Sequence, residues 1–262
     1  METTNEKTCV VLNIGRQSIA DADSVMTRLA DLRYAEQIPD VLLLLSHPPG
    51  LSIGARPLNR SDLLMPLDFF TGKGIGLHQS ERGGGLTYHW PGQLICYPVM
   101  KLAAHEKNIP QYMDRLEEVA IRTLYAFGVQ AHRKREETAQ IGLWVGDRKI
   151  ASMGISISRW ITRYGFALNL YGDLSPSRYI RPCGLKDVSL TSIEQLTGIT
   201  VDREEVAGKL IGHFRDVFNR HMILDRGRFG GYPGDSDTDS IMRVISVFSN
   251  EINFEKIDEE LV

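Results

Sequence analysis

A run of twelve residues, from Arg82 to Gln93, constrains the fold of this chain more than any other segment. It reads RGGGLTYHWPGQ: three consecutive glycines precede a short extended stretch, and a Pro-Gly pair then bends the chain. Glycine inside a strand loses packing and costs conformational entropy, so three in a row indicate close backbone approach by a ligand or another chain. The alternative is a bulged hairpin that binds nothing. Arg82 and His89, on either side of the glycines, favour a binding site.

Composition limits the remaining choices. At 262 residues, 42% hydrophobic and 24% charged, the chain can bury one large core, with or without a small appendage. A net charge of -3 gives no reason to expect a nucleic-acid partner. The three cysteines cannot all pair within one chain and lack zinc-ligand spacing, which fits a reducing cytosol. No signal peptide or membrane span is recognisable, so we expect a cytoplasmic protein that does not contact a membrane.

Apolar periodicity predicts a layered fold in which strands outnumber long helices. The α/β (α+β) class is expected, with residues 223–262 as an acidic, glycine-containing C-terminal tail that is peripheral or partly disordered. Helices are expected after residue 22, from 110 to 128 and from 202 onward. Strands are expected over 8–14, 41–45, 75–79, 86–89, 94–99, 141–145, 149–157 and 160–170.

Several familiar chemistries lack their sequence signatures. The GKGIG segment at 72–76 has neither Walker A nor GxGxxG spacing, so nucleotide phosphates have no obvious cradle. The chain contains no HExxH, paired CxxC or EF-hand pattern, and no GxSxG elbow presents a serine. We therefore expect neither a metal nor a cofactor.

Cysteines are the remaining candidate nucleophiles. Cys9 and Cys96 lie in apolar strands, where a thiol usually behaves as a small buried hydrophobe. Cys183 lies in an RPCG loop, where the proline fixes the approach and the glycine lets the following N–H face a reacting carbonyl. Lys149 opens a strand after a tight turn, and taken alone it is typical of a solvated charge.

Four segments together resemble the lipoyl(octanoyl) transferases, within the fold family of biotin and lipoate protein ligases. The RGG, TYH and PGQ groups at 82–93 match a substrate-cradling motif, and the RKI and SMG groups at 148–154 match a lysine strand. The GFALN segment at 165–169 matches the next strand, and PCG at 182–184 matches a cysteine loop. The resemblance covers residues 8–222. It implies a biotin/lipoate-ligase-like fold, a mixed β-sheet flanked by helices, with residues 1–222 as a single octanoyltransferase domain.

The resemblance also implies an activity in lipoate biosynthesis and protein lipoylation. An octanoyl group would pass from octanoyl-acyl carrier protein to the lysine of lipoyl domains, in 2-oxoacid dehydrogenase complexes and the glycine cleavage H protein. A thioester donor is already activated, so amide formation needs no ATP. The enzyme is expected to be a monomer.

Cys183 and Lys149 are the catalytic residues that the resemblance implies. Thiolate attack by Cys183 on the donor would give an acyl-enzyme thioester, and a nearby Lys149 ammonium should lower the pKa of the thiol. Once the thiolate charge has disappeared, Lys149 releases a proton more readily and can act as base for the incoming lysine. The implied substrate-binding residues are Arg82, Gly83, Gly84, Gly85, Leu86, Thr87, Tyr88, His89, Ser152, Met153, Gly154, Gly165, Phe166 and Ala167.

Two positions depart from the family pattern. Trp90 stands where a glycine is usual, and Tyr164 where a histidine is common. If Trp90 lined the acyl tunnel it would shorten the tunnel or cover its mouth, altering acyl-chain preference. Alternatively Trp90 turns outward and Tyr164 replaces a hydrogen bond. Two other functions stay open: an ATP-dependent lipoate or biotin ligase, which would not need Cys183, and a non-catalytic paralogue that binds lipoyl domains or carrier protein.

Overall fold

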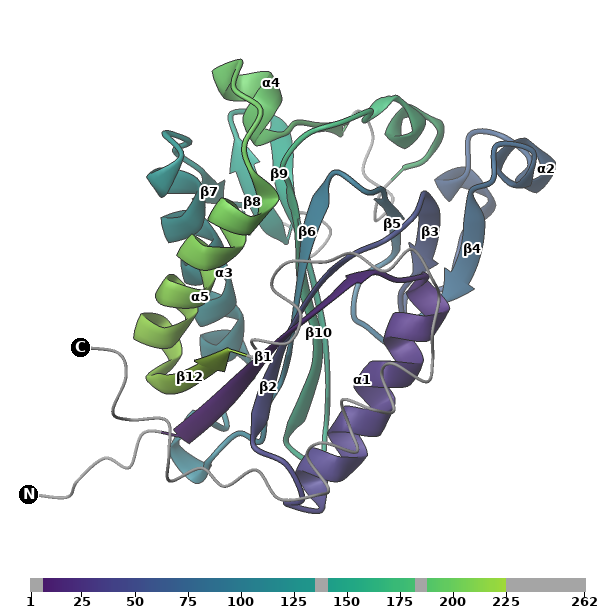
Figure 1. The fold of residues 1–262 in the computed structure, drawn as a ribbon. Coiled ribbons are helices and arrows are strands. Elements are labelled where there is room, and N and C mark those ends of the chain that lie inside the picture. The colour runs from purple at the N-terminus through teal and green to yellow at the C-terminus, as the bar shows by residue number, and fades with distance from the viewer. Residues whose placement is uncertain (1–6, 135–140, 182–187, 225–262) are drawn as a thin grey trace, which may run out of the picture.

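Apolar runs in the sequence form the centre of one large mixed sheet. The computed structural model describes residues 7–134, 141–181 and 188–224. Within them the strand order is β12-β1-β2-β6-β10-β9-β8-β7, and β11 pairs with β9 (Figure 1). All seven residues of β2 are buried, as its apolar run predicts. The strands of this sheet are β1 (Lys7–Arg16), β2 (Asp40–Ser46), β6 (Gln93–Val99), β7 (His132–Arg133), β8 (Gly142–Val145), β9 (Arg148–Ser158), β10 (Ile161–Asn169), β11 (Ser189–Leu190) and β12 (Arg220–Leu224).

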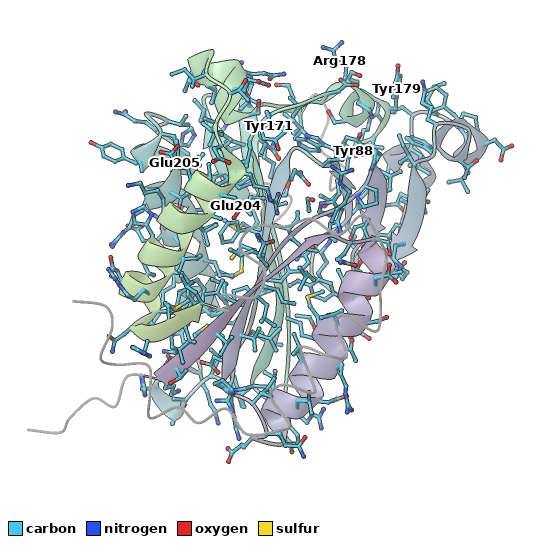
Figure 2. The ribbon with its side chains drawn as sticks, viewed as in Figure 1. Tyr88, Tyr171, Arg178, Tyr179, Glu204 and Glu205 are labelled. Carbon is cyan, nitrogen blue, oxygen red and sulfur yellow. The ribbon has the colours of Figure 1, made fainter. Side chains whose placement is uncertain are left out.

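Helices cover both faces of this sheet (Figure 1). On one face lies α1 (Ile19–Tyr34), and on the other lie α3 (Ile109–Ala126) and α5 (Arg203–Phe218). The Asp202 side chain caps α5 by accepting a hydrogen bond from the backbone N–H of Glu204. Glu204 and Glu205 lie in the first turn of that helix (Figure 2), where negative charge complements the helix dipole. The expected mixed sheet flanked by helices is confirmed.

A small second sheet stands beside the large one (Figure 1). Its order is β4-β3-β5, from β3 (Gly50–Ile53), β4 (Gly76–Gln79) and β5 (Leu86–His89). The sequence did not predict β3, because Pro48 and Pro49 immediately before it read only as a break. In the structure residues 47–49 connect β2 of the large sheet to β3 of the second sheet. Among the described residues the shorter elements are α2 (Leu67–Thr71), α4 (Ile193–Thr197) and the 3₁₀ turns Arg60–Asp62, Ala104–Glu106 and Ser175–Tyr179.

The last described strand closes one edge of the large sheet. β12 pairs parallel with β1, so the expected domain boundary at residue 222 falls inside a strand. The rest of the expected tail, residues 225–262, lies outside the described residues. No helix in the described ranges is long and apolar enough to cross a membrane.

Candidate active site

The glycine segment is closely approached by another part of the same chain. Residues 54–56 run alongside it: the backbone N–H of Gly54 donates to the carbonyl of Gly85 (3.1 Å), and that of Arg56 donates to the carbonyl of Gly84 (3.0 Å). A Cβ added at Gly85 would lie 2.6 Å from Nε of Arg56. At these positions the close approach that the sequence predicted is therefore made by the protein itself.

Further close contacts join the motif strands. The Gly83 N–H donates to the Ile155 carbonyl of β9 (2.8 Å), and a Cβ at Gly154 would lie 3.1 Å from the Gly83 carbonyl oxygen. A Cβ at Gly165 would lie 2.3 Å from the Cys96 carbonyl oxygen. Larger side chains at Gly154 and Gly165 would thus push apart backbones that now touch.

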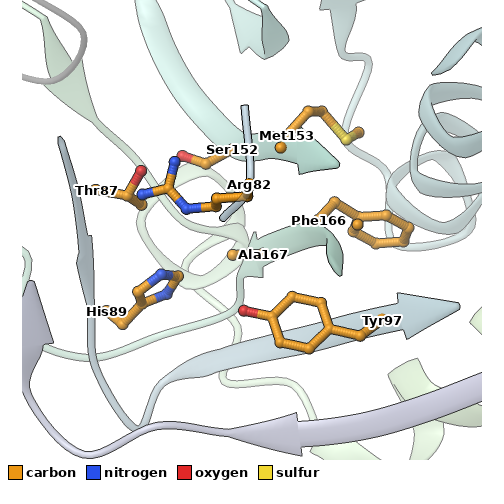
Figure 3. Close-up of a pocket in the computed structure, with 10 residues that line it drawn as sticks. Arg82, Thr87, His89, Tyr97, Ser152, Met153, Phe166 and Ala167 are labelled. Atoms are coloured by element: carbon orange, nitrogen blue, oxygen red, sulfur yellow. The ribbon is translucent and has the colours of Figure 1, made fainter. Parts of the chain in front are cut away.

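A pocket of about 270 Å³, part of it open to solvent, lies between these elements (Figure 3). The structure brings nine of the expected substrate-binding residues to its wall and adds Tyr97 of β6, which sequence reasoning passed over because it lies in the largely apolar run 94–99. The other expected residues, Gly83, Gly84, Gly85, Leu86 and Tyr88, do not line it; Leu86 and Tyr88 belong to the core of the small sheet. The wall consists of Arg82, Thr87, His89, Tyr97, Ser152, Met153, Gly154, Gly165, Phe166 and Ala167.

Arg82 brings a buried positive charge to this pocket. Its Nε donates to the Ser52 hydroxyl (2.9 Å), Nη2 to the Ser52 carbonyl (2.7 Å), and Nη1 to the Gly83 carbonyl (3.1 Å). These bonds attach the glycine segment to β3. Figure 3 shows the guanidinium beside Thr87, facing the same space as His89.

Two neutral histidines adjoin the pocket. The rings of His89 and His47 meet edge to face, with centroids 5.1 Å apart. Nδ1 of His47 donates to the Gln17 carbonyl (2.8 Å), since a carbonyl can only accept. Burial lowers the pKa of His47 to about 4, and burial, with the neighbouring His47 and Arg82, lowers the pKa of His89 well below its ordinary value. Both rings are therefore uncharged at neutral pH.

Lys149 is buried, so its interpretation as a solvated charge is wrong. Only 5% of the residue is exposed, and its Nζ donates to the Ile141 carbonyl (2.8 Å) and lies 5.4 Å from the centre of the Trp144 ring. On β9 it is three residues from Ser152 of the pocket wall. A buried ammonium is costly to desolvate, which is typical of a functional lysine.

Cys183, with Pro182 and Gly184, lies outside the described residues. The two described cysteines, Cys9 and Cys96, are fully buried in β1 and β6. Burial raises the pKa of both thiols well above the usual value, which disfavours the reactive thiolate.

The two unusual rings both have defined structural partners. Trp90 is buried rather than turned to solvent; it stacks on Tyr88 with centroids 5.5 Å apart and donates from Nε1 to the Tyr171 carbonyl (2.8 Å). It is not among the residues of the pocket wall. The Tyr164 hydroxyl donates to the Asp23 carboxylate and accepts from the backbone N–H of Glu81 (3.0 Å).

Comparisons with known proteins agree with this architecture. The family model described as lipoyl protein ligase A/B catalytic domain matches residues 18–215. An octanoyltransferase of Caldicellulosiruptor bescii is 38% identical over 82% of this chain and 93% of its own length, and one of Desulforamulus reducens is 36% identical over 80% and 90%.

Solved structures show the same fold. A lipoate-protein ligase A bound with ATP has a TM-score of 0.65 at 16% identity, covering 94% of this chain and 95% of its own. A bipartite lipoate protein ligase of Thermoplasma acidophilum has a TM-score of 0.63 at 17% identity, covering 94% and 93%. The chain belongs to the octanoyltransferase family, within the lipoyl protein ligase A/B catalytic domains.

Proposed function

We propose that this enzyme transfers an octanoyl group from octanoyl-acyl carrier protein to the lysine amine of lipoyl domains through a Cys183 thioester. The observation that carries the proposal is the burial of Lys149 in β9, the strand that also contributes Ser152, Met153 and Gly154 to the pocket wall. The curated relatives named octanoyltransferase support the acyl group. The archaeal ligase of similar fold was described with its E2 lipoyl domain, which supports the class of acceptor.

The reaction divides into two exchanges. The Cys183 thiolate attacks the carbonyl carbon of the donor; a carbon–sulfur bond to Cys183 forms while the bond to the carrier's sulfur breaks. The acceptor amine then attacks the acyl-enzyme, so that a carbon–nitrogen bond forms and the bond to Cys183 breaks. Lys149 takes the proton that the amine loses.

The surroundings of Lys149 suit both steps. Burial disfavours its ammonium form, whereas an adjacent thiolate favours it. Acylation removes the thiolate charge that stabilised the ammonium, so Lys149 then releases its proton more readily, to the thiolate that departs with the carrier. The hydrogen bond from Nζ to the Ile141 carbonyl holds the nitrogen in place in either state.

The described residues on both sides of the cysteine loop support the pairing of Cys183 with Lys149. The N–H of Arg181 donates to the Asp62 carbonyl (2.7 Å), and β11 pairs with β9 so that Leu190 lies opposite Lys149. The six-residue step from Cys183 to Ser189 spans at most about 20 Å when extended. The proposal requires the thiol to lie beside Lys149, and a chain of this length permits it.

Mass spectrometry of the intact protein tests the nucleophile. After incubation with octanoyl-acyl carrier protein, the wild type should gain one octanoyl mass and Cys183→Ser should gain none. Cys9→Ala is the matched control and should still be acylated, because that thiol is buried in β1. An octanoyl adduct on Cys183→Ser would overturn the assignment.

Further assays distinguish the two other functions, an ATP-dependent ligase and a non-catalytic paralogue. Product formed from free octanoate and ATP, and retained in Cys183→Ala, would identify a ligase instead. Binding of carrier protein and lipoyl domain without any adduct on the wild type would identify a non-catalytic paralogue. We further propose lipoyl domains of 2-oxoacid dehydrogenase complexes and the glycine cleavage H protein as acceptors, and a cytoplasmic monomer as the working form.

A further inference from the structure

A chain of buried side chains runs from His89 to the strand that carries Lys149. Nδ1 of His89 lies 2.9 Å from Oε1 of Gln93, and Nε2 of Gln93 lies 3.0 Å from Oδ1 of Asn169. Nδ2 of Asn169 lies 2.8 Å from the Thr191 carbonyl oxygen and 3.4 Å from that of Lys149. All five residues are buried.

The backbone carbonyls at the end of this series determine which group donates and which accepts in each of its hydrogen bonds. The carbonyls of Thr191 and Lys149 can only accept, so the Asn169 nitrogen faces them and its oxygen faces Gln93. Gln93 must then donate to Asn169 with its nitrogen and present its oxygen to His89. The proton of the neutral imidazole therefore resides on Nδ1 of His89, and Nε2 carries a lone pair.

This lone pair belongs to a residue of the pocket wall. Nε2 of His89 has no hydrogen-bond partner among the residues that the structure describes, and the ring faces the space shared by Arg82 and the Tyr97 hydroxyl (Figure 3). The Tyr97 hydroxyl is directed to Nε2 of the other histidine, His47 (3.4 Å). A substrate hydrogen-bond donor is the natural partner for Nε2 of His89.

We propose that Gln93 and Asn169 are positioning residues that hold His89 in the Nδ1–H tautomer, and that Nε2 of His89 accepts an N–H of the acceptor amine. The inference rests on the proposed function. At the reacting atoms the acyl thioester offers only acceptors, so the amine is the one substrate group that can donate there. Nε2 then holds one N–H of the amine, and the second proton goes to Lys149 as the carbon–nitrogen bond forms.

The test measures three quantities separately: the tautomer of His89, the rate of acyl-enzyme formation and the rate of aminolysis of the acyl-enzyme. Long-range proton–nitrogen NMR of the free wild type should show His89 protonated on Nδ1 alone. Gln93→Glu places a carboxylate beside Nδ1, favours the imidazolium and removes the acceptor lone pair. Single-turnover aminolysis of the acyl-enzyme by a lipoyl domain should then fall about tenfold or more, while acyl-enzyme formation changes less than about twofold.

Two control variants distinguish an effect of the His89 tautomer from an effect of added charge or of misfolding. Gln111→Glu adds the same charge at an exposed helix start and should leave the spectrum and both rates unchanged. Gln93→Met removes the hydrogen-bond partner without adding charge, and should yield mixed tautomers and slower aminolysis even if Gln93→Glu does not fold. A wild-type His89 protonated on Nε2, or wild-type aminolysis in a variant whose tautomer has changed, would overturn the inference. Failure of the wild type to form an acyl-enzyme would instead overturn the proposed function.

Discussion

Gly142 leaves the space that the Lys149 side chain occupies. Its φ of +137° lies in a region that favours glycine, and a Cβ there would lie 2.6 Å from Cε of Lys149 and 2.5 Å from the Ala151 carbonyl oxygen. Gly142→Ala should therefore displace the lysine amine and slow acyl-enzyme formation about 100-fold. Backbone strain should also reduce the free energy of unfolding by about 1–3 kcal/mol.

Gly146 supplies the matched control for that substitution. It also has a positive φ, +57°, but an added Cβ would meet nothing within 4 Å. Gly146→Ala should thus lose about 1–2 kcal/mol of stability, measured by urea unfolding, without loss of acylation rate. Equal acylation rates in the two variants would show that Gly142 does not position Lys149.

At the scale of elements, Trp90 belongs to the small sheet rather than to the pocket. Its ring stacks on Tyr88 of β5 and is buried in the cluster that β3, β5 and α2 share. Trp90→Gly should reduce the free energy of unfolding by about 3–5 kcal/mol and leave the preference for eight-carbon donors unchanged. Phe166→Leu, a change in the pocket wall, should shift that preference. Competition among acyl-carrier donors of different length measures both, and a shift caused by Trp90→Gly would place its indole along the acyl path.

Local sequence patterns predicted most elements but not the contacts between them. The apolar run of β2 and the helical spacing of Ala22, Val25 and Leu29 in α1 were sufficient to identify both elements. β3 was missed because it is short and follows two prolines, and β12 because it begins directly after the end of α5. Both strands are stabilised mainly by distant partners, which a local pattern does not contain.

For the candidate site, too, the sequence indicated residues but not the contacts between them. Glycine content indicated close backbone approach, but not that residues 54–56 make it. The burial of Lys149 depends on Gly142 in the neighbouring strand and on a carbonyl eight residues away. The tautomer of His89 depends on a hydrogen-bond chain that ends at residue 191. Such features arise only once the strands are paired.

At the scale of the whole molecule, an ionic cluster ties the last described strand to the rest of the fold. Arg220 of β12 contacts Asp40 of β2 (Nε to Oδ2, 3.0 Å) and Glu106 (Nη2 to Oε1, 2.7 Å), and Lys7 of β1 contacts the other Glu106 oxygen (3.0 Å). Burial alone would raise the pKa of Glu106, but hydrogen bonds from the Ala103 N–H, Lys7 and Arg220 lower it to about 2.

The lowered pKa of Glu106 makes stability depend on pH in a defined direction. Because folding depresses this pKa below its unfolded value of about 4.3, the contribution to stability is complete above that pH and is lost as pH falls towards 2. Glu106→Gln should therefore be less stable than the wild type at pH 7 and lose less stability between pH 5 and pH 2. Glu205→Gln, at an exposed site in the first turn of α5, should lose only a helix-dipole contribution of about 0.3–1 kcal/mol and should otherwise run parallel to the wild-type curve. Urea unfolding at several pH values measures these curves, and parallel curves for Glu106→Gln and the wild type would exclude the cluster as the source of acid sensitivity.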